Sequence, residues 1–451
     1  MADSCVVIGG GLAGMTAAIR FAEQGGRSIV LERSDAEGGD GNARISGGLF
    51  HIAWRPMDEP ADALFDAVIA TTDGEADPSL ARTLADNALE ATTWLEKQGA
   101  EFARKGPRPY MKFALAPHTV GVGKRHIAER GPDQTMCRLY ERARDLGVEI
   151  RTGASASRLA PAPSGWEVTY HTVEGVETVT AETVMVADGG FQGNQELLAR
   201  YVGANAGSAF LRASDASTGN GLSMLLDAGA GATGLGRVYG HVLSRNAFDN
   251  DELWPYPPLD KLCLMGALVD RGGRLFPTAA ENGVQLVNEL VRTEDPRGFY
   301  VICDDALWQD AGTDNPYGTP VPNPDLQQRG GHFVSAHTLE DLAAELGMPV
   351  EVLRSSVASH NTATGKAGLS GAPFHALAVV PGITFTQGGV RTDDSGRVLD
   401  TAGHPIPGLF AAGSCVGGIQ GGPRGGYVGG LAVALVFGYV AGVAMAENKT
   451  A

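Results

Sequence analysis

Val6-Val7-Ile8-Gly9-Gly10-Gly11-Leu12-Ala13-Gly14 decides the fold, because it sets the pattern GxGxxG directly after a short apolar run and at the start of an amphipathic segment. Residues 4–8 are predicted to form a strand, the next segment a helix to about residue 24, and residues 28–31 a second strand. In such a unit Gly9 permits the tight turn, Gly11 lets a pyrophosphate approach the backbone, and Gly14 lets the helix sit against the strand. The sequence therefore predicts a β-α-β unit that binds a dinucleotide.

The residues around this turn specify how the dinucleotide would be held. Leu12 and Ala13 open the helix, whose free N–H groups and partial positive charge suit phosphates. Glu32, followed by Arg33, closes the second strand at the spacing needed to accept hydrogen bonds from ribose hydroxyls. A carboxylate there would repel a 2′-phosphate, so NADP is disfavoured.

Chain length, glycine content and net charge limit the class of protein. A chain of 451 residues is too long for one compact core, so two domains, or one large domain with an insertion, are expected. Its 63 glycines are about twice the average share of about 7%, and their short runs suggest backbone packed against a large ligand. The net charge of −17 disfavours nucleic acid and anionic membranes as partners.

Cysteine usage and apolar stretches bear on location. The five cysteines are odd in number, widely spaced and free of CxxC, so neither a disulfide framework nor a metal site is indicated, and a cytoplasmic protein is expected. The strand pattern begins by Cys5, which leaves no room for a signal peptide. Residues 429–446 are apolar, but their Gly and Ala content and short length favour a buried helix over a membrane span.

The rest of the chain predicts an α/β fold, with a Rossmann-like domain that contains a parallel sheet and a β-meander, interrupted by an inserted α+β domain. Regularity of period two between residues 154 and 187 indicates the meander and its return to the parallel sheet. From about residue 232 the β-α regularity is lost, and prolines, aromatics and loops gather. The expected divisions are 1–231, 232–374 for the insertion and 375–451. Helices are expected over residues 61–70, 79–98, 133–146, 339–346 and 350–361.

Four segments carry a resemblance to a known family: the N-terminal unit, residues 38–48, Val184-Met185-Val186-Ala187-Asp188-Gly189-Gly190-Phe191, and Ile406-Pro407-Gly408-Leu409-Phe410-Ala411-Ala412-Gly413. Together they resemble the FAD-dependent fumarate reductase/succinate dehydrogenase flavoprotein superfamily, which also includes 3-ketosteroid and tricarballylate dehydrogenases. The resemblance runs from end to end, and the insertion falls where that family has its capping domain.

The resemblance implies FAD, with its adenosine end at Gly9–Glu32 and its isoalloxazine between the Ser46 region and the last helix. The N-terminus of that helix would offer N–H groups to the flavin C2 carbonyl. Binding is expected to be non-covalent, because no His precedes His51 and His51 lacks the His-Thr context of covalent attachment. Beyond the N-terminal unit, the residues implied for the cofactor are Gly39, Asn42, Ser46, Gly47, Gly48, Ala187, Asp188, Gly189, Gly413, Ser414, Gly430 and Leu431.

The candidates for the chemistry are Arg424, Tyr427, His241 and Arg292. Arg424 falls near the position of a substrate-binding Arg in fumarate reductases, where ketosteroid dehydrogenases have a Tyr, and an Arg fork suits a carboxylate or polarised carbonyl. Tyr427, close to one helical turn away, is an alternative proton carrier, ahead of Tyr239 and Tyr110. His241 lies near the family's cap-edge histidine, although a structural histidine fits equally well.

Departures from the family weaken the expectation of fumarate reduction. Arg292 matches the proton-carrying Arg in a shifted register, and an ordinary surface ion pair explains it as well. The family's second histidine is missing, because this chain reads Thr384-Phe385-Thr386-Gln387-Gly388-Gly389 at that position.

Three functions remain open. The first is a flavin-dependent desaturase that takes hydride from the carbon β to a carbonyl or carboxylate of a small molecule, with Arg424 holding the oxygen and Tyr427, His241 or Arg292 taking the α-proton. The second is the reverse reaction, an ene-reductase of an unsaturated acid. The third is a flavoprotein with a structural or sensor role. No haem or iron–sulfur motif is present, so an external electron acceptor is expected.

Overall fold

The computed structural model describes residues 4–118, 128–255, 258–313, 325–364 and 368–447. Its first sheet has the strand order β19-β20-β10-β1-β2-β6, in which β20, β10, β1, β2 and β6 run parallel and β19 is antiparallel to β20. The strands are β1 (Ser4–Ile8), β2 (Arg27–Leu31), β6 (Glu149–Arg151), β10 (Thr183–Val186), β19 (Arg397–Leu399) and β20 (Pro405–Ala411). The predicted Rossmann-like parallel sheet is therefore present.

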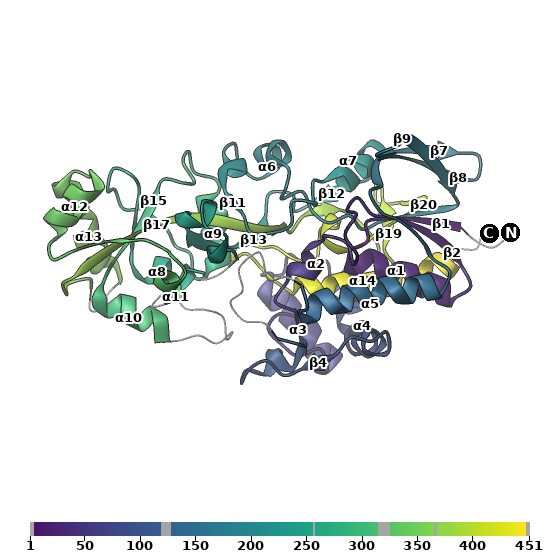
Figure 1. The fold of residues 1–451 in the computed structure, drawn as a ribbon, viewed down its shortest axis with the longest axis horizontal. Coiled ribbons are helices and arrows are strands. Elements are labelled where there is room, and N and C mark those ends of the chain that lie inside the picture. Colours follow the sequence, from purple (N-terminus) through teal and green to yellow (C-terminus); the bar gives the residue numbers. More distant parts are fainter. Residues whose placement is uncertain (1–3, 119–127, 256–257, 314–324, 365–367, 448–451) are drawn as a thin grey trace.

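Helices cover one face of this sheet, where α1 (Leu12–Glu23) and α14 (Gly430–Glu447) pack against each other and both contact its strands (Figure 1). Two glycines let α14 approach α1 closely: a Cβ at Gly438 would lie 2.5 Å from the Ala13 carbonyl oxygen, and one at Gly442 2.7 Å from that of Ala17. Within the described ranges, α14 is the one helix long and apolar enough to cross a membrane, but 61% of it is buried inside the protein. The prediction of a buried helix is confirmed.

The other face carries the predicted meander, formed by β7 (Ser155–Ala162), β8 (Gly165–Thr172) and β9 (Gly175–Ala181). Its apolar side chains, such as Val168 and Tyr170, join one core with Val184 and Val186 of the parallel sheet. Trp166 Nε1 donates a hydrogen bond to the Pro407 carbonyl oxygen at 2.9 Å, which ties the meander to β20.

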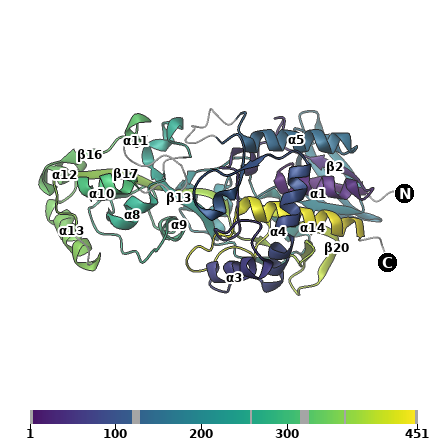
Figure 2. The ribbon, with the colours of Figure 1, turned by 90° about the horizontal axis from the view of Figure 1, so that it is seen from below.

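A second sheet lies at the far end of an elongated molecule from the N- and C-termini (Figures 1 and 2). Its long central strand, β17 (Phe374–Thr386), pairs with four others. The remaining strands are β11 (Phe210–Leu211), β13 (Val238–Ser244), β14 (Ala267–Val269), β15 (Phe299–Asp304) and β16 (Val334–Ala336). The helices of this unit are α8 (Asp260–Met265), α9 (Gly283–Leu290), α10 (Asp305–Thr313), α11 (Asp325–Gln328), α12 (Leu339–Leu346) and α13 (Val350–Thr364).

The pairing of β17 bears on the expected division of the chain. All its partners belong to the second sheet, so residues 375–386 lie with the insertion rather than with the returning segment. β11 joins the same sheet from residues 210–211, ahead of the expected start at 232. The sheet pairing thus favours a capping unit that begins earlier and ends near residue 386.

The remaining elements surround the first sheet. Among the expected helices, α3 (Ala61–Thr71), α4 (Pro78–Lys97) and α5 (Gly131–Asp145) begin and end within two residues of the predicted bounds. The shorter elements are α2 (Asn42–Ile45), β3 (Leu49–Phe50), β4 (Phe102–Ala103), β5 (Phe113–Leu115), α6 (Gln195–Tyr201), α7 (Asn220–Asp227), β12 (Ala232–Thr233) and β18 (Gly389–Val390).

Candidate active site

A cavity of about 1200 Å³ runs from the glycine turn after β1 to β13 and α8 of the second sheet. It opens at the carboxyl ends of the parallel strands, where ligands bind in such sheets. The predicted cofactor residues that line it are Gly9, Gly11, Leu12, Ala13, Glu32, Arg33, Asn42, Ser46, Gly47, Gly48, Ala187, Asp188, Gly189, Gly413, Ser414, Gly430 and Leu431.

The glycines of the turn have the separate roles that the motif assigns to them. Gly9 has φ +101°, and a Cβ there would lie 2.6 Å from the Ala187 carbonyl oxygen. A Cβ at Gly14 would lie 2.0 Å from the Gly9 carbonyl oxygen, so Gly14 serves packing of α1 and does not line the cavity. A Cβ at Gly11 would meet nothing within 4 Å, which leaves open space at the backbone where a pyrophosphate would approach.

Glu32 lies buried at the end of β2 and faces the turn. Its Oε2 accepts a hydrogen bond from Gly10 N at 2.8 Å, and its Oε1 accepts one from Ser34 N at 2.8 Å. Burial raises the pKa of Glu32, and the two backbone N–H groups act in the opposite direction. Gly39 packs behind Glu32 and does not line the cavity. A Cβ at Gly39 would come within 2.7 Å of the Tyr140 hydroxyl oxygen.

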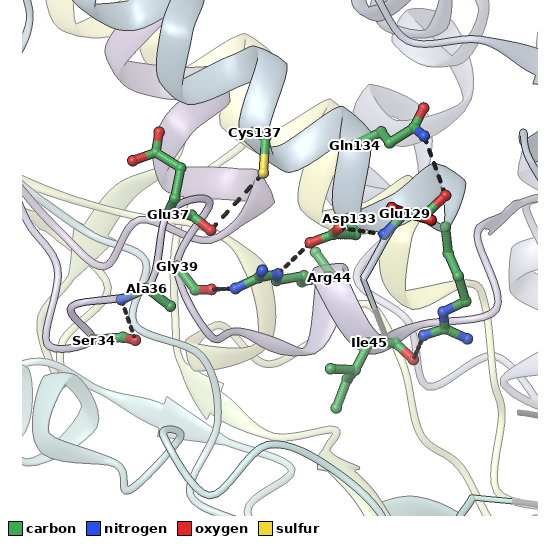
Figure 3. Close-up of polar contacts among 12 residues, drawn as sticks. Ser34, Ala36, Glu37, Gly39, Arg44, Ile45, Glu129, Asp133, Gln134 and Cys137 are labelled. Carbon is green, nitrogen blue, oxygen red and sulfur yellow. Dashed lines mark hydrogen bonds and ion pairs between the residues drawn. The ribbon is translucent and has the colours of Figure 1, made fainter. Parts of the chain in front are cut away.

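Polar contacts hold the loop after β2 against α5 (Figure 3). Arg44 forms an ion pair with Asp133 at 2.5 Å and donates to the Gly39 carbonyl oxygen at 2.8 Å. Asp133 also accepts from Glu129 N at 2.8 Å, and the Cys137 thiol lies 3.9 Å from the Glu37 carbonyl oxygen. The segment that carries Gly39, Asn42 and Ser46 is thereby fixed from behind.

Asp188 supplies a polar group with unused hydrogen-bonding capacity on the cavity wall. Its Oδ2 accepts from Gly221 N at 2.7 Å, whereas its Oδ1 is covered and has no hydrogen-bond partner in the described part of the chain. Burial raises the pKa of Asp188 to about 6. A bound ligand with a donor group would satisfy this oxygen, since buried polar atoms are normally hydrogen-bonded.

Strand β13 and helix α8 supply three connected polar side chains to the same cavity. Tyr239 Oη lies 3.0 Å from His241 Nε2, and His241 Nδ1 lies 2.5 Å from Asp260 Oδ2. The Tyr239 ring stacks on Tyr427 with a centroid distance of 3.9 Å. Tyr427 Oη in turn accepts a hydrogen bond from Gly430 N, in the first turn of α14, at 3.2 Å.

Next to Tyr427, further aromatic rings pack together near the end of β3. The His51 ring stacks on Trp54 with a centroid distance of 4.7 Å and makes edge contacts with Tyr110 and Tyr427. His51 Nδ1 accepts a hydrogen bond from Trp54 N at 3.3 Å. Complete burial lowers the pKa of His51 to about 4, so the ring is neutral near pH 7.

The glycine turn, the Glu32 carboxylate, the Asp188 oxygen and the α14 N-terminus together fit a large dinucleotide whose ring system reaches the second sheet. A family model described as an FAD binding domain matches residues 4–429. The chain belongs to this family. The predicted fumarate reductase/succinate dehydrogenase flavoprotein superfamily and the FAD cofactor are both confirmed.

Curated relatives match along almost all of the chain. NADH:fumarate oxidoreductase of Klebsiella pneumoniae (strain 342) is 26% identical over 465 residues, which cover 97% of this chain and 47% of that protein. Urocanate reductase of Eggerthella lenta is 26% identical over 478 residues, 97% of this chain and 73% of that protein. The chain thus spans less than half the length of the Klebsiella protein.

Solved structures share the fold. A flavocytochrome c3 fumarate reductase in its open conformation has a TM-score of 0.72 at 22% identity, covering 100% of this chain and 79% of that one. The 3-ketosteroid-delta4-(5alpha)-dehydrogenase from Rhodococcus jostii RHA1 also has a TM-score of 0.72 at 22% identity, with coverage of 98% and 97%.

The candidates for the chemistry fall in different places. His241, Arg424 and Tyr427 line the cavity, but Arg292 does not. Arg292 follows α9 and donates to the carbonyl oxygens of Asn288, in that helix, and of Gly236, before β13, so an equivalence to a proton-carrying Arg is not supported.

Arg424 is held by a partner that the sequence did not indicate. Its guanidinium makes an ion pair with Asp73, at the end of α3, with Arg424 Nε 2.8 Å from Asp73 Oδ1. Arg424 and Tyr427 also lie in a loop before α14, so the expectation of one helical turn between them is wrong. The glycines around them explain this, since Gly421, Gly422 and Gly425 all have positive φ.

Sequence patterns did not indicate two polar residues that line the cavity, Asp260 and Arg212. Asp260 is 19 residues from His241 and shares no motif with it. Arg212 is buried and donates to Pro255 O and Thr384 Oγ1, both at 2.9 Å. Pairing of β11 with β17 brings Arg212 to the cavity, and packing of α8 on β13 brings Asp260 there; neither contact has a local sequence signal.

Proposed function

We propose that this chain is an FAD-dependent oxidoreductase that desaturates a C–C bond next to a carbonyl group of a small molecule. One observation carries the proposal: a single cavity joins the flavin-site glycines to tyrosine and histidine side chains of the second sheet. Such a cavity places a substrate between the cofactor and the groups that hold an oxygen and move a proton. When bound, FAD supplies the hydride chemistry, and the protein must orient the substrate and take up the proton.

Tyr427 is the residue that we assign to the substrate oxygen. Its hydroxyl oxygen accepts from Gly430 N, and a phenol in that position can donate its own hydrogen to a carbonyl oxygen. The N-terminus of α14 has partial positive charge, which favours the negative charge that develops on the carbonyl oxygen as the α-proton leaves.

Arg424 suits a carboxylate better than a ketone, but it is engaged elsewhere. A substrate carboxylate would have to compete with Asp73 for the guanidinium, whereas a ketone held by Tyr427 leaves that ion pair intact. A ketone is therefore the better-supported substrate, and the two residues provide separate tests.

The test is anaerobic mixing of the oxidised holoprotein with cyclic ketones and with saturated carboxylic acids, followed at the oxidised flavin band. Bleaching by a ketone that slows in Tyr427→Phe supports the proposal, with Tyr201→Phe as a control for loss of a hydroxyl outside the cavity. Bleaching only by carboxylic acids, lost in Arg424→Ala and retained in Tyr427→Phe, would reassign the oxygen site to Arg424.

The reverse reaction is a second candidate, and the relatives favour it. The Klebsiella and Eggerthella proteins are named as reductases of fumarate and urocanate. If this chain is an ene-reductase, an unsaturated acid should reoxidise the photoreduced flavin and no saturated compound should bleach the oxidised form. A flavin inert in both experiments would point to a structural or sensor role.

Three further properties belong to the proposal. FAD is held without a covalent bond, because His51 is buried, stacked on Trp54 and hydrogen-bonded through Nδ1; acid precipitation should then release all the flavin. The protein works in the cytoplasm, in keeping with its five free cysteines, which cell fractionation would test. Its electrons pass to an external acceptor, to be sought by assay with oxygen, quinones and nicotinamide cofactors.

A further inference from the structure

Two side chains of the second sheet and one of the neighbouring helix α8 form one hydrogen-bonded series. Tyr239 and His241 are two residues apart on β13, and their side chains lie on the same face, with Tyr239 Oη 3.0 Å from His241 Nε2. Asp260 is the first residue of α8 and reaches His241 Nδ1 through Oδ2 at 2.5 Å. Its other oxygen, Oδ1, accepts from Val242 N at 2.7 Å, which fixes the carboxyl group against β13.

The donors and acceptors of these groups fix the direction in which the hydrogen bonds of the series run. An ionised carboxylate only accepts hydrogen bonds, so His241 carries its hydrogen on Nδ1 and donates it to Asp260. His241 Nε2 is then an acceptor, and the Tyr239 hydroxyl, 3.0 Å away, donates to it. This arrangement prepares the phenol to pass its proton to the imidazole.

The series ends at the place where a substrate would react. Tyr239, His241 and Asp260 all line the cavity, and the Tyr239 ring stacks on Tyr427, the residue assigned to the substrate oxygen. The α-carbon of a ketone is directly bonded to its carbonyl carbon, so a group next to Tyr427 can reach the α-proton. Arg292, the other candidate for a proton carrier, lies outside the cavity.

We propose that Tyr239 takes the α-proton of the substrate, that His241 receives the Tyr239 proton, and that Asp260 is the positioning residue that holds His241 in the required tautomer. The proposal rests on the proposed function. The α-carbon–hydrogen bond breaks and its proton bonds to Tyr239 Oη while the Tyr239 proton moves to His241 Nε2. The electron pair of the broken bond would form the C=C bond, with bound FAD supplying the acceptor for the hydride of the β-carbon.

The proton step can be measured without the redox step. With the flavin kept reduced, a saturated ketone cannot transfer hydride, and its α-proton exchanges through an enolate whose charge lies on the carbonyl oxygen. We would follow the loss of the α-proton NMR signals of 2-decalone in D2O with the reduced holoprotein. Wild type should exchange them faster than buffer alone, and Tyr239→Phe should slow the exchange on the order of 10²-fold.

Asp260 needs a readout that a structural role would not change. Asp260→Asn should slow exchange at least tenfold while 2-decalone affinity, measured from the perturbed flavin spectrum, stays the same. His241→Gln should have a similar effect, and the double variant should lose little more, since residues that act as a unit are not additive. Asp305→Asn is the matched control, because Asp305 also begins a helix and faces a histidine, His375, at 3.4 Å.

The proposal is overturned if wild type exchanges no faster than buffer, if Asp260→Asn and Asp305→Asn behave alike, or if the His241 and Asp260 effects multiply. Should Asp260→Asn fail to bind FAD, Tyr239→Phe and His241→Gln decide by the same criteria. Exchange that depends on Tyr239 and Asp260, together with an oxidised flavin that no ketone bleaches, would contradict the proposed function and leave the relay standing.

Discussion

His51 predicts an acid-sensitive step in the stability of the fold. The ring is 2% exposed and stacked on Trp54, and its Nδ1 accepts a hydrogen bond from Trp54 N, so protonation of Nδ1 would break that bond and place a charge in a buried ring. Burial lowers its pKa from 6.5 to about 4 in the folded protein. The unfolded chain therefore binds a proton at His51 more readily than the folded one.

The difference between the folded and unfolded pKa values of His51 fixes the sign and size of the effect of pH on the free energy of unfolding. Because the folded pKa is depressed, the contribution is fully present above about pH 6.5 and is lost as the pH falls toward 4. With these two pKa values, His51 should lower the free energy of unfolding by about 2 kcal/mol between pH 7.5 and pH 5, and by about 3 kcal/mol at pH 4.

The assay is urea unfolding in saturating FAD at pH 7.5 and pH 5 for wild type and His51→Asn. Asn cannot titrate and keeps an oxygen that can accept from Trp54 N. The variant should be less stable at pH 7.5 through lost packing, yet lose about 2 kcal/mol less than wild type on moving to pH 5. His171→Asn, at an exposed histidine of β8, controls for loss of an imidazole elsewhere. The reasoning is refuted if His51→Asn and wild type lose the same stability between the two pH values.

Three further predictions concern the flavin site. Glu32→Gln should weaken FAD binding about 10- to 100-fold, because the carboxylate holds the glycine turn through charge-assisted hydrogen bonds that it accepts from Gly10 N and Ser34 N, each worth about 1.5–3 kcal/mol. Titration of flavin fluorescence measures this affinity, and an unchanged value would contradict the prediction. Gly14→Ala should destabilise the protein by about 1–3 kcal/mol, because its Cβ would lie 2.0 Å from the Gly9 carbonyl oxygen; an unchanged melting temperature would show that α1 shifts freely. Arg44→Ala should leave the Asp133 carboxylate without its ion pair and lower the free energy of unfolding by about 1–3 kcal/mol. The loop should then be cut faster by proteases within residues 34–46. Equal cleavage rates in wild type and variant would count against the contacts in Figure 3 as the anchor of this loop.

The parts of the fold that local sequence patterns determine were predictable. The turn from Gly9 to Gly14 has a fixed spacing and a fixed context, and α12 (Leu339–Leu346) has the predicted bounds because the periodicity of its apolar residues ends at Gly347. The second sheet was predicted only as an irregular insertion. β17 pairs with strands from residues 210 to 336, and such non-local pairing leaves no periodic signal.

The candidate site also contains residues that local sequence patterns predicted and residues that they did not. The glycines and Glu32 were found because the backbone conformation and the spacing of the motif require them. The partners of Arg424 and His241 were not, since Asp73 is 351 residues from Arg424 in the chain and Asp260 reaches His241 only through the packing of α8 on β13. The sequence therefore predicted the cofactor but not the hydrogen bonds of the residues around the substrate.

Hydride transfer from a ketone to the flavin can be measured by single-turnover bleaching with 2-decalone deuterated at its β-carbon. The oxidised flavin band should disappear under anaerobic conditions, and β-deuteration should slow its disappearance, because the β-carbon–hydrogen bond breaks in that step. An oxidised band that persists with every cyclic ketone and carboxylic acid, or a bleaching rate that β-deuteration leaves unchanged, would contradict this hydride transfer.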